Sequence, residues 1–188
     1  MSNNANNVAV GKPKVGGAVF VAPIGTSLPT DATSSIAAAF NDLGYISDSG
    51  VVNSNTMETQ SFKAWGGDPV YDALTGKTDT YKMTFIEATN LDVLKVVYGS
   101  DNVTGTLESG ITIKANSKEQ ASQSFCIDTV LRDGTLKRIV IPNGKVTAVG
   151  DITYNDSTLV GYETTISAYP DSQGNTHYEY VKKHNTSM

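Results

Sequence analysis

The sequence predicts a mainly β domain: an antiparallel β-sandwich or barrel-like fold with one flanking α-helix, a long inter-strand loop and two terminal arms. The composition is dominated by Thr, Ser, Val, Gly and Asn, and only 18% of the 188 residues are charged, as is typical of strands and turns. Short apolar or alternating runs are separated by Gly, Pro, Asn and Asp. One segment carries a complete set of helix signals.

The N-terminal part begins with a polar, Asn-rich segment, residues 1–16, which predicts an arm rather than a part of the core. Residues 18–22 (AVFVA) form an apolar run closed by Pro23 and predict a buried strand. Residues 35–40 (SIAAAF) favour one or two helical turns, and residues 43–47 favour another strand.

Residues 54–62 (SNTMETQSF) alternate like a strand but offer little apolar surface on either face. Such a strand cannot fill a core, so we expect it to lie against water or a wet channel. Residues 63–79 contain the only tryptophan, two adjacent glycines and a proline, and show no sustained period. They predict a long loop, and structureless connections of this length are often functional. Residues 80–88 return as a strand.

The second half of the chain is expected to contain the helix and most of the strands. Asn90 is an N-cap and Gly99 a stop signal for a helix over residues 90–98. Asp133-Gly134 predicts a type I′ hairpin turn, because both residues tolerate positive φ. Pro142-Asn143-Gly144 predicts the next reversal. Strands are expected over residues 104–114, 122–131, 136–141, 145–154 and 159–169, the last one half-buried.

The composition excludes several kinds of chemistry. Cys126 is the only cysteine, which rules out an intramolecular disulfide and multi-cysteine metal sites. Both histidines, His177 and His184, lie near the C-terminus, so the body of the chain has no imidazole for a catalytic dyad. Asp128 and Glu163 could pair for glycoside hydrolysis, but the sequence does not place them opposite one another. We expect no enzyme, no cofactor and no metal.

The charge and hydropathy limit the partners. A net charge of −5 argues against a surface that wraps nucleic acid, and no apolar run is long enough to span a membrane. Residues 1–7 lack the build of a signal peptide, so we expect synthesis in a cytoplasm. Trp65, which is preceded by Ala64 and followed by Gly66-Gly67, is either an anchor in a neighbour's pocket or a lid on its own core. The anchor is favoured because tryptophan is enriched among interface hot spots.

Several segments together resemble the major tail tube proteins of long-tailed siphophages that infect actinobacteria. They are residues 17–32 (GAVFVAPIGTSLPTDA), 40–50 (FNDLGYISDSG), 90–99 (NLDVLKVVYG) and 144–171, which contains Gly150-Asp151-Ile152 and ends in Ala168-Tyr169-Pro170-Asp171. None of these strings is a catalytic motif, so the resemblance rests on their order and spacing.

The resemblance implies a subunit that forms hexameric rings stacked into a hollow tube. Such a tube encloses a tape measure protein, meets tail terminator and tail tip proteins, and conducts DNA without binding it specifically. The implied location is the virion, with assembly in the host cytoplasm. Six copies at −5 each would carry −30 per ring, which predicts an acidic bore.

The resemblance also implies roles for particular segments. Residues 1–16 and 172–188 would be terminal arms around a tail tube domain at 17–171, and the loop at 63–79 would tie one ring to the next. The residues expected to face the lumen are Thr56, Glu58 and Gln60. The residues expected at contacts between subunits or rings are Val8, Val10, Phe62, Trp65 and Tyr71.

Two alternatives stay open at this point. A carbohydrate- or receptor-binding β-sandwich would share the composition and could use Trp65 and Tyr71 as stacking platforms. The same kind of tube subunit could also belong to a phage-tail-like bacteriocin. Rings or filaments of the purified protein would distinguish the tube from the binding module.

Overall fold

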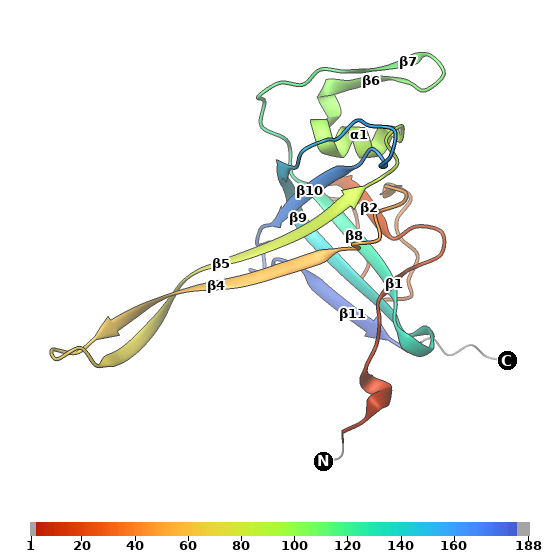
Figure 1. Ribbon diagram of the computed structural model, residues 1–188. Coiled ribbons are helices and arrows are strands. Elements are labelled where there is room, and N and C mark those ends of the chain that lie inside the picture. The colour runs from red at the N-terminus through yellow and green to blue at the C-terminus, as the bar shows by residue number, and fades with distance from the viewer. Residues whose placement is uncertain (1–2, 184–188) are drawn as a thin grey trace.

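The computed structural model describes residues 3–183, and these fold as a mainly β protein with one α-helix among them, as the sequence predicts (Figure 1). The strands are β1 (Lys12–Pro13), β2 (Val19–Pro23), β3 (Asn41–Asp42), β4 (Val52–Lys63), β5 (Pro69–Phe85), β6 (Val103–Thr106), β7 (Gly110–Ile113), β8 (Gln123–Val130), β9 (Leu136–Val149), β10 (Tyr162–Ala168) and β11 (Tyr178–Lys182). The helical elements are η1 (Ala5–Asn7), α1 (Leu91–Tyr98), η2 (Ser100–Asn102) and η3 (Arg132–Gly134).

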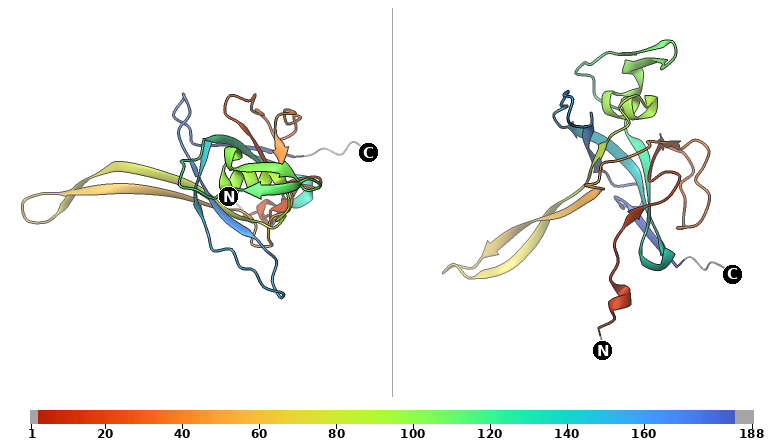
Figure 2. Two further views of the ribbon diagram at one scale, coloured as in Figure 1. Left: turned by 90° about the horizontal axis from the view of Figure 1, so that it is seen from above. Right: turned by 45° about the vertical axis from the view of Figure 1, so that its right-hand side comes forward.

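Nine strands form one antiparallel sheet in the order β3-β2-β8-β9-β10-β5-β4, with β1 paired to β8 and β11 paired to β9. β6 and β7 form a separate two-stranded sheet beside α1 (Figure 1). The large sheet does not close into a barrel. Its end strands cannot meet, because β3 has only two residues and β4 leaves the body with β5 (Figure 2).

Two hydrophobic clusters lie on opposite faces of the central strands. The larger cluster contains Val19 and Val21 of β2 together with the buried residues of α1. The smaller cluster contains Ala22 of β2 and Cys126 of β8, and Phe40 packs into it. Since neighbouring residues of a strand point to opposite faces, β2 contributes to both clusters, and this part of the sheet is covered on both sides.

The helix α1 forms where the sequence predicts it. The Asn90 side chain accepts hydrogen bonds from the Asp92 and Val93 amides at 3.0 and 3.5 Å and so caps the N-terminus. Gly99 ends the helix with a φ of 92°, and its amide donates to the Lys95 carbonyl. Burial of one helix face against the sheet, rather than helix propensity, stabilises so short a helix.

The Pro142-Asn143-Gly144 segment continues β9 instead of reversing the chain, which corrects the predicted turn. Gln123 of β8 pairs with Gly144, whereas Phe125 pairs with Ile141, so β9 carries an extra residue here and forms a bulge. A proline without an amide is tolerated at such a bulge. The Asp133-Gly134 turn is as predicted, with both residues at positive φ.

The largest departure from the predictions is the segment 63–79, which was expected to be a long loop. β4 ends at Lys63 and β5 begins at Pro69, so only residues 64–68 connect them, and the rest belongs to a long hairpin that projects from the body (Figures 1 and 2). The sequence did not predict the strand at residues 69–78, because both of its faces are exposed and it therefore lacks the usual alternation of apolar residues.

Smaller segments also differ. Residues 35–40 are not helical, and residues 43–47 contribute only the isolated bridge between Ile46 and Phe85. The strand expected over residues 104–114 is the β6–β7 hairpin, because the chain turns at residues 107–109. Both terminal segments, expected as arms, contribute a strand to the sheet: β1 pairs with β8, and β11 pairs with β9.

Candidate interaction surface

The β4–β5 hairpin has a buried root and an exposed outer part. In β5, Asp79, Tyr81, Met83 and Phe85 are buried, whereas most residues from Pro69 to Thr78 are exposed. All of β4 is exposed. At about 3.4 Å per residue, the stretch from residue 56 to residue 63 extends the hairpin by roughly 27 Å beyond its root. The outer part therefore reaches well beyond the core of its own chain.

One face of the hairpin is polar from the root as far as Gln60. Thr56 lies opposite Thr78, Glu58 lies opposite Gly76, and Gln60 lies opposite Ala73. Since cross-strand partners share a face, the three residues predicted to face a lumen lie on one side of the hairpin, as their alternation requires. All three are exposed.

This polar face continues across β10 and the end of β9. Thr80, Lys82 and Thr84 of β5 lie opposite Ser167, Thr165 and Glu163 of β10. An ion pair joins Lys82 Nζ and Glu163 Oε1 at 2.8 Å, and the hydroxyls of Thr147 and Ser167 are 2.8 Å apart. The four strands β9, β10, β5 and β4 thus share one hydroxyl-rich face. Where these strands belong to the body, their opposite face packs against the hydrophobic core.

This four-stranded part of the sheet has a free edge at each end. β4 is the last strand of the sheet, and its outer edge pairs with no described strand. β8 leaves β9 at Gly144, so no described strand pairs with residues 145–149 on that side. Exposed edges of this kind recruit other strands unless they are blocked.

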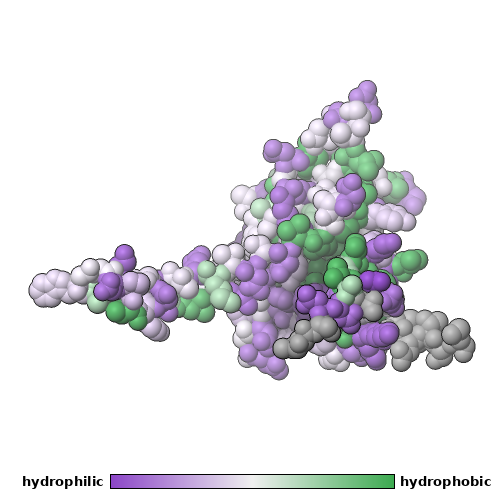
Figure 3. Space-filling model, turned by 60° about the horizontal axis from the view of Figure 1, so that its bottom comes forward, coloured by the Kyte–Doolittle hydropathy of each residue, from purple (hydrophilic) through white to green (hydrophobic). Residues whose placement is uncertain are grey.

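Several large apolar side chains are exposed on the outer part of the hairpin, where Figure 3 shows small hydrophobic patches among polar residues. Phe62 and Tyr71 are cross-strand partners with ring centroids 6.1 Å apart, and they lie beyond Gln60 on the face that carries Thr56 and Glu58. Met57 and Leu74 lie on the opposite face and are more than half exposed. Trp65, at the tip, has a relative exposure of 107%. Trp65 does not cover the core of its own chain, so the alternative that it acts as a lid is wrong. Exposed apolar clusters of this kind mark interaction sites.

Val8 and Val10, the other residues predicted at contacts, lie far from the hairpin along the chain and contact a different part of the body. They are 70% and 74% exposed and line a shallow groove with Val130 and Leu131 of the β8–β9 turn. The predicted contact residues therefore form two separate surfaces.

A polar cluster lies at the hairpin root, and the sequence did not predict it. The Asp79 carboxylate is fully buried and accepts hydrogen bonds from Asn53 and Thr176, while His177 Nδ1 lies 2.5 Å from its Oδ2 atom. Burial raises the pKa of Asp79, but the hydrogen bonds from Thr176, Asn53 and His177 outweigh this and hold the pKa below its usual value. Thr176 and His177 are separated from Asp79 by 97 and 98 positions in the chain, so no local sequence pattern could reveal these contacts.

The two carboxylates considered for glycoside hydrolysis do not meet. Glu163 lies on the exposed polar face with Lys82, whereas Asp128 is buried and binds Arg138 through two hydrogen bonds of 2.6 and 2.8 Å. Burial is also the main cause that raises the pKa of the Cys126 thiol, to about 12. A thiol with this pKa is not a nucleophile at neutral pH.

The arginine of this buried pair also joins distant segments. Its Nη1 atom donates to the carbonyl oxygens of Asp31 and Ser34 at 3.1 and 2.8 Å, and Lys14 Nζ lies 3.3 Å from the Asp128 carboxylate. The N-terminal segment and the loop that covers the smaller cluster are therefore fastened to β8 and β9 by one ion-pair network.

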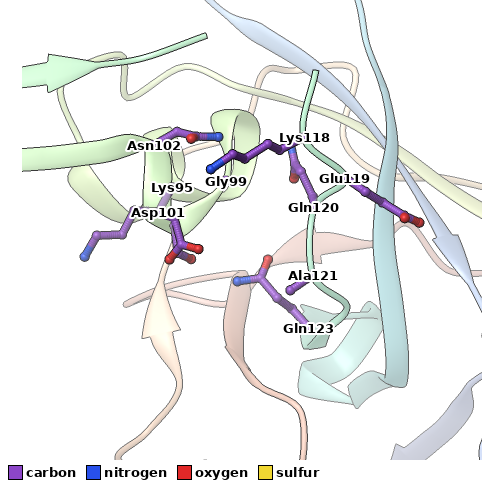
Figure 4. Close-up of a pocket in the computed structure, with 10 residues that line it drawn as sticks. Lys95, Gly99, Asp101, Asn102, Lys118, Glu119, Gln120, Ala121 and Gln123 are labelled. Carbon is purple, nitrogen blue, oxygen red and sulfur yellow. The ribbon is translucent and has the colours of Figure 1, made fainter. Parts of the chain in front are cut away.

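A small pocket of about 110 Å³ lies between the end of α1 and the segment that leads to β8 (Figure 4). Its charged residues have both signs: Lys95 and Lys118 against Asp101 and Glu119. Residues 3–183 contain no group of three or more His, Cys, Asp and Glu side chains that could hold a metal ion. None of the helices within this range is long and apolar enough to cross a membrane.

The exposed hairpin and the two free strand edges are suited to contacts with other chains, and the comparison with known protein families agrees. The family model described as "Phage tail tube protein" matches residues 1–188. The chain belongs to the phage tail tube protein family. Membership gives it a structural role as a tube subunit and a component of the phage tail, as the resemblance implied, and implies that it is not an enzyme.

Among solved structures, the tail tube protein is similar to one described as the anti-feeding prophage cap, the tube terminating cap, studied by electron cryo-microscopy. The sequence identity is 10% and the TM-score is 0.46, and the match covers 96% of this chain and 99% of the other. A search of curated proteins found no match.

Proposed function

We propose that this tail tube protein forms closed rings, six subunits to a ring, that stack into the tube of a long non-contractile phage tail. The observation that carries the proposal is the four-stranded sheet β9-β10-β5-β4, which is polar on one face and has a free edge at each end. The polar face would line the bore, and the two edges would pair between neighbouring subunits.

The strand directions allow this closure. β9, β10, β5 and β4 alternate in direction, so β4 of one subunit and residues 145–149 of the next run antiparallel when the subunits are related by rotation about the tube axis. A head-to-tail contact of this kind closes into a ring. Closure would bury both unpaired edges, which otherwise promote aggregation.

The charges of the polar face refine the expectation of an acidic bore. Glu58 and Glu163 are balanced by Lys82 and Lys145, and Lys145 also contacts Glu119. Binding of DNA requires an excess of Lys and Arg that releases counterions from the phosphates. The bore would therefore let DNA pass because it lacks an excess of positive charge and offers mainly hydroxyl groups, not because it is strongly acidic.

The contact residues have a role in the same assembly. Phe62, Trp65 and Tyr71 on the hairpin, together with Val8 and Val10 on the N-terminal segment, would pack against other copies of the chain, since their own chain leaves large parts of these apolar side chains exposed. The tube would enclose a tape measure protein and end at terminator and tip proteins. Assembly would take place in the host cytoplasm, in a phage of an actinobacterial host.

Ring closure is tested at Val149. The Gly150 amide donates to Glu163 on β10, and amides of neighbouring residues point in opposite directions, so the Val149 amide points to the free edge. Val149→Pro removes this donor, and we expect a folded monomer that forms no tubes in negative-stain electron microscopy. Val149→Thr retains the amide and the branched shape and should form tubes. Tubes of normal length from the Val149→Pro protein would overturn the proposed closure.

A further inference from the structure

The hairpin is attached to the body by a buried carboxylate. Asp79 Oδ1 accepts a hydrogen bond from Asn53 Nδ2 at 2.8 Å, and Asp79 Oδ2 accepts one from Thr176 Oγ1 at 2.6 Å. His177 Nδ1 approaches the same Oδ2 atom at 2.5 Å. The Asp79 side chain has no exposed surface, so every donor it uses is supplied by the chain itself.

Three elements meet at this carboxylate. Asn53 belongs to β4 and Asp79 to β5, whereas Thr176 and His177 belong to the segment that leads into β11. The His177 ring also meets the Tyr81 ring edge-on, with centroids 5.6 Å apart and an interplanar angle of 85°. The C-terminal segment therefore contacts both Asp79 and Tyr81 of β5 at the same point.

This point is the last one at which the hairpin contacts the body through buried side chains. Asp79 is 2% exposed, and every residue of the hairpin between Asn55 and Thr78 is exposed or only partly buried. A buried charge is costly unless its donors stay in place. A change at the root is also magnified at the tip, which lies roughly 27 Å farther out at about 3.4 Å per residue.

We infer that Thr176 and His177 latch the root of the hairpin through Asp79, so that the C-terminal segment holds the hairpin in a fixed direction relative to the body. Asp79, Thr176 and His177 are positioning residues. Their use in tube assembly rests on the proposed function, but the latch itself is a property of the monomer.

The test uses two spin labels on the full chain, at Asp68→Cys on the hairpin tip and at Lys95→Cys on α1. Double electron–electron resonance should give a narrow distance distribution for the parent. Thr176→Val, which removes one hydroxyl and keeps the shape, should broaden it, and Thr176→Ser should restore the parent width. Asp72→Asn, an exposed carboxylate on the same strand, should have no effect. Cys126 is buried and does not compete for the label.

Hydrogen exchange gives a second measurement on the unlabelled protein. In Thr176→Val, amide exchange at the hairpin root and in β11 should rise together by about ten-fold, the change expected from losing one hydrogen bond to a charged group. Asp79→Asn should produce a larger rise in the same two segments. If Asp79→Asn does not fold, Thr176→Val decides the matter alone.

Unchanged label distances and unchanged exchange in Thr176→Val would overturn the latch. Its failure is distinguishable from failure of ring closure. Normal tubes from Val149→Pro together with broadened distances in Thr176→Val would overturn the closure and support the latch. Loss of tubes in Val149→Pro with unaltered distances in Thr176→Val would support the closure and overturn the latch.

Discussion

The two ends of β5 follow different rules within one strand. From Asp79 to Phe85 alternate residues are buried, and their partners are β10, α1 and the segment before β11. From Pro69 to Thr78 nearly all residues are exposed, although β4 is paired along the whole length. The inner end is stabilised by its own chain. The outer end is exposed, and under the proposed function another copy of the chain would cover it.

Hydrogen bonding and burial are therefore separate contributions to the stability of a strand. An isolated two-stranded hairpin is marginally stable in water, and here the outer hairpin is held at its root by the pairing of β5 with β10, by the core residues of β5 and by the latch at Asp79. The outer hairpin therefore contributes little to the folding of the body, whereas the assembled tube would depend on it. Three predictions test this separation.

The largest effect is expected when the outer hairpin is removed. Thr56 and Thr78 are cross-strand partners, so residues 57–77 can be replaced by Asn-Gly, which favours a tight turn. The free energy of unfolding in urea should change by about 1 kcal/mol or less, because nothing buried is lost and a shorter connection costs less entropy. Tube formation should be abolished in negative stain. Tubes from this variant would show that the outer hairpin is not an assembly surface.

The second effect concerns the body. Arg138→Met leaves the buried Asp128 carboxylate without its main partner and should reduce the free energy of unfolding by about 3–5 kcal/mol, measured by urea denaturation followed by circular dichroism. Arg132→Met is the control, since Arg132 is half exposed in the β8–β9 turn and should cost about 0.5 kcal/mol or less. Equal stability of the two variants would contradict the role given to the buried pair.

The smallest effect is expected at the polar face. Glu58→Lys should leave folding and tube assembly intact, because Glu58 is exposed and faces only Gly76 across the hairpin. If this face lines the bore, release of DNA from assembled phage should become slower and more sensitive to salt, since the new lysines displace counterions from phosphates. Glu108→Lys, in the exposed β6–β7 turn, is the matched control. A salt dependence that Glu58→Lys leaves unchanged would remove Glu58 from the lumen.

Features encoded by neighbouring residues were predictable. The cap at Asn90, the stop at Gly99 and the Asp133-Gly134 turn depend on backbone geometry within a few residues, and the structure confirms all three. The exposure of residues 54–62 was predictable for a related reason, because a strand without an apolar face cannot enter a core. The lumen role of those residues stays a prediction.

Features that depend on distant residues were not predictable. Residues 69–78 form a strand because β4 supplies their backbone partners, and no apolar alternation marks them. Pro142 lies within β9 because an extra residue there is accommodated opposite β8. The Asp79 cluster joins segments far apart in the chain. In each case the deciding contact is nonlocal, and the local pattern favoured a turn, a loop or no structure.

The network around Arg138 has a consequence for the order of folding. Its guanidinium binds carbonyl groups 107 and 104 positions earlier in the chain. The β8–β9 hairpin, joined by a tight turn, can form from contacts within a short stretch, whereas such distant contacts pay a larger loop-closure entropy and form slowly. During synthesis, the segment around residues 31–34 must therefore wait until residue 138 has left the ribosome. A segment made early in synthesis therefore reaches its final place only after most of the chain has been made.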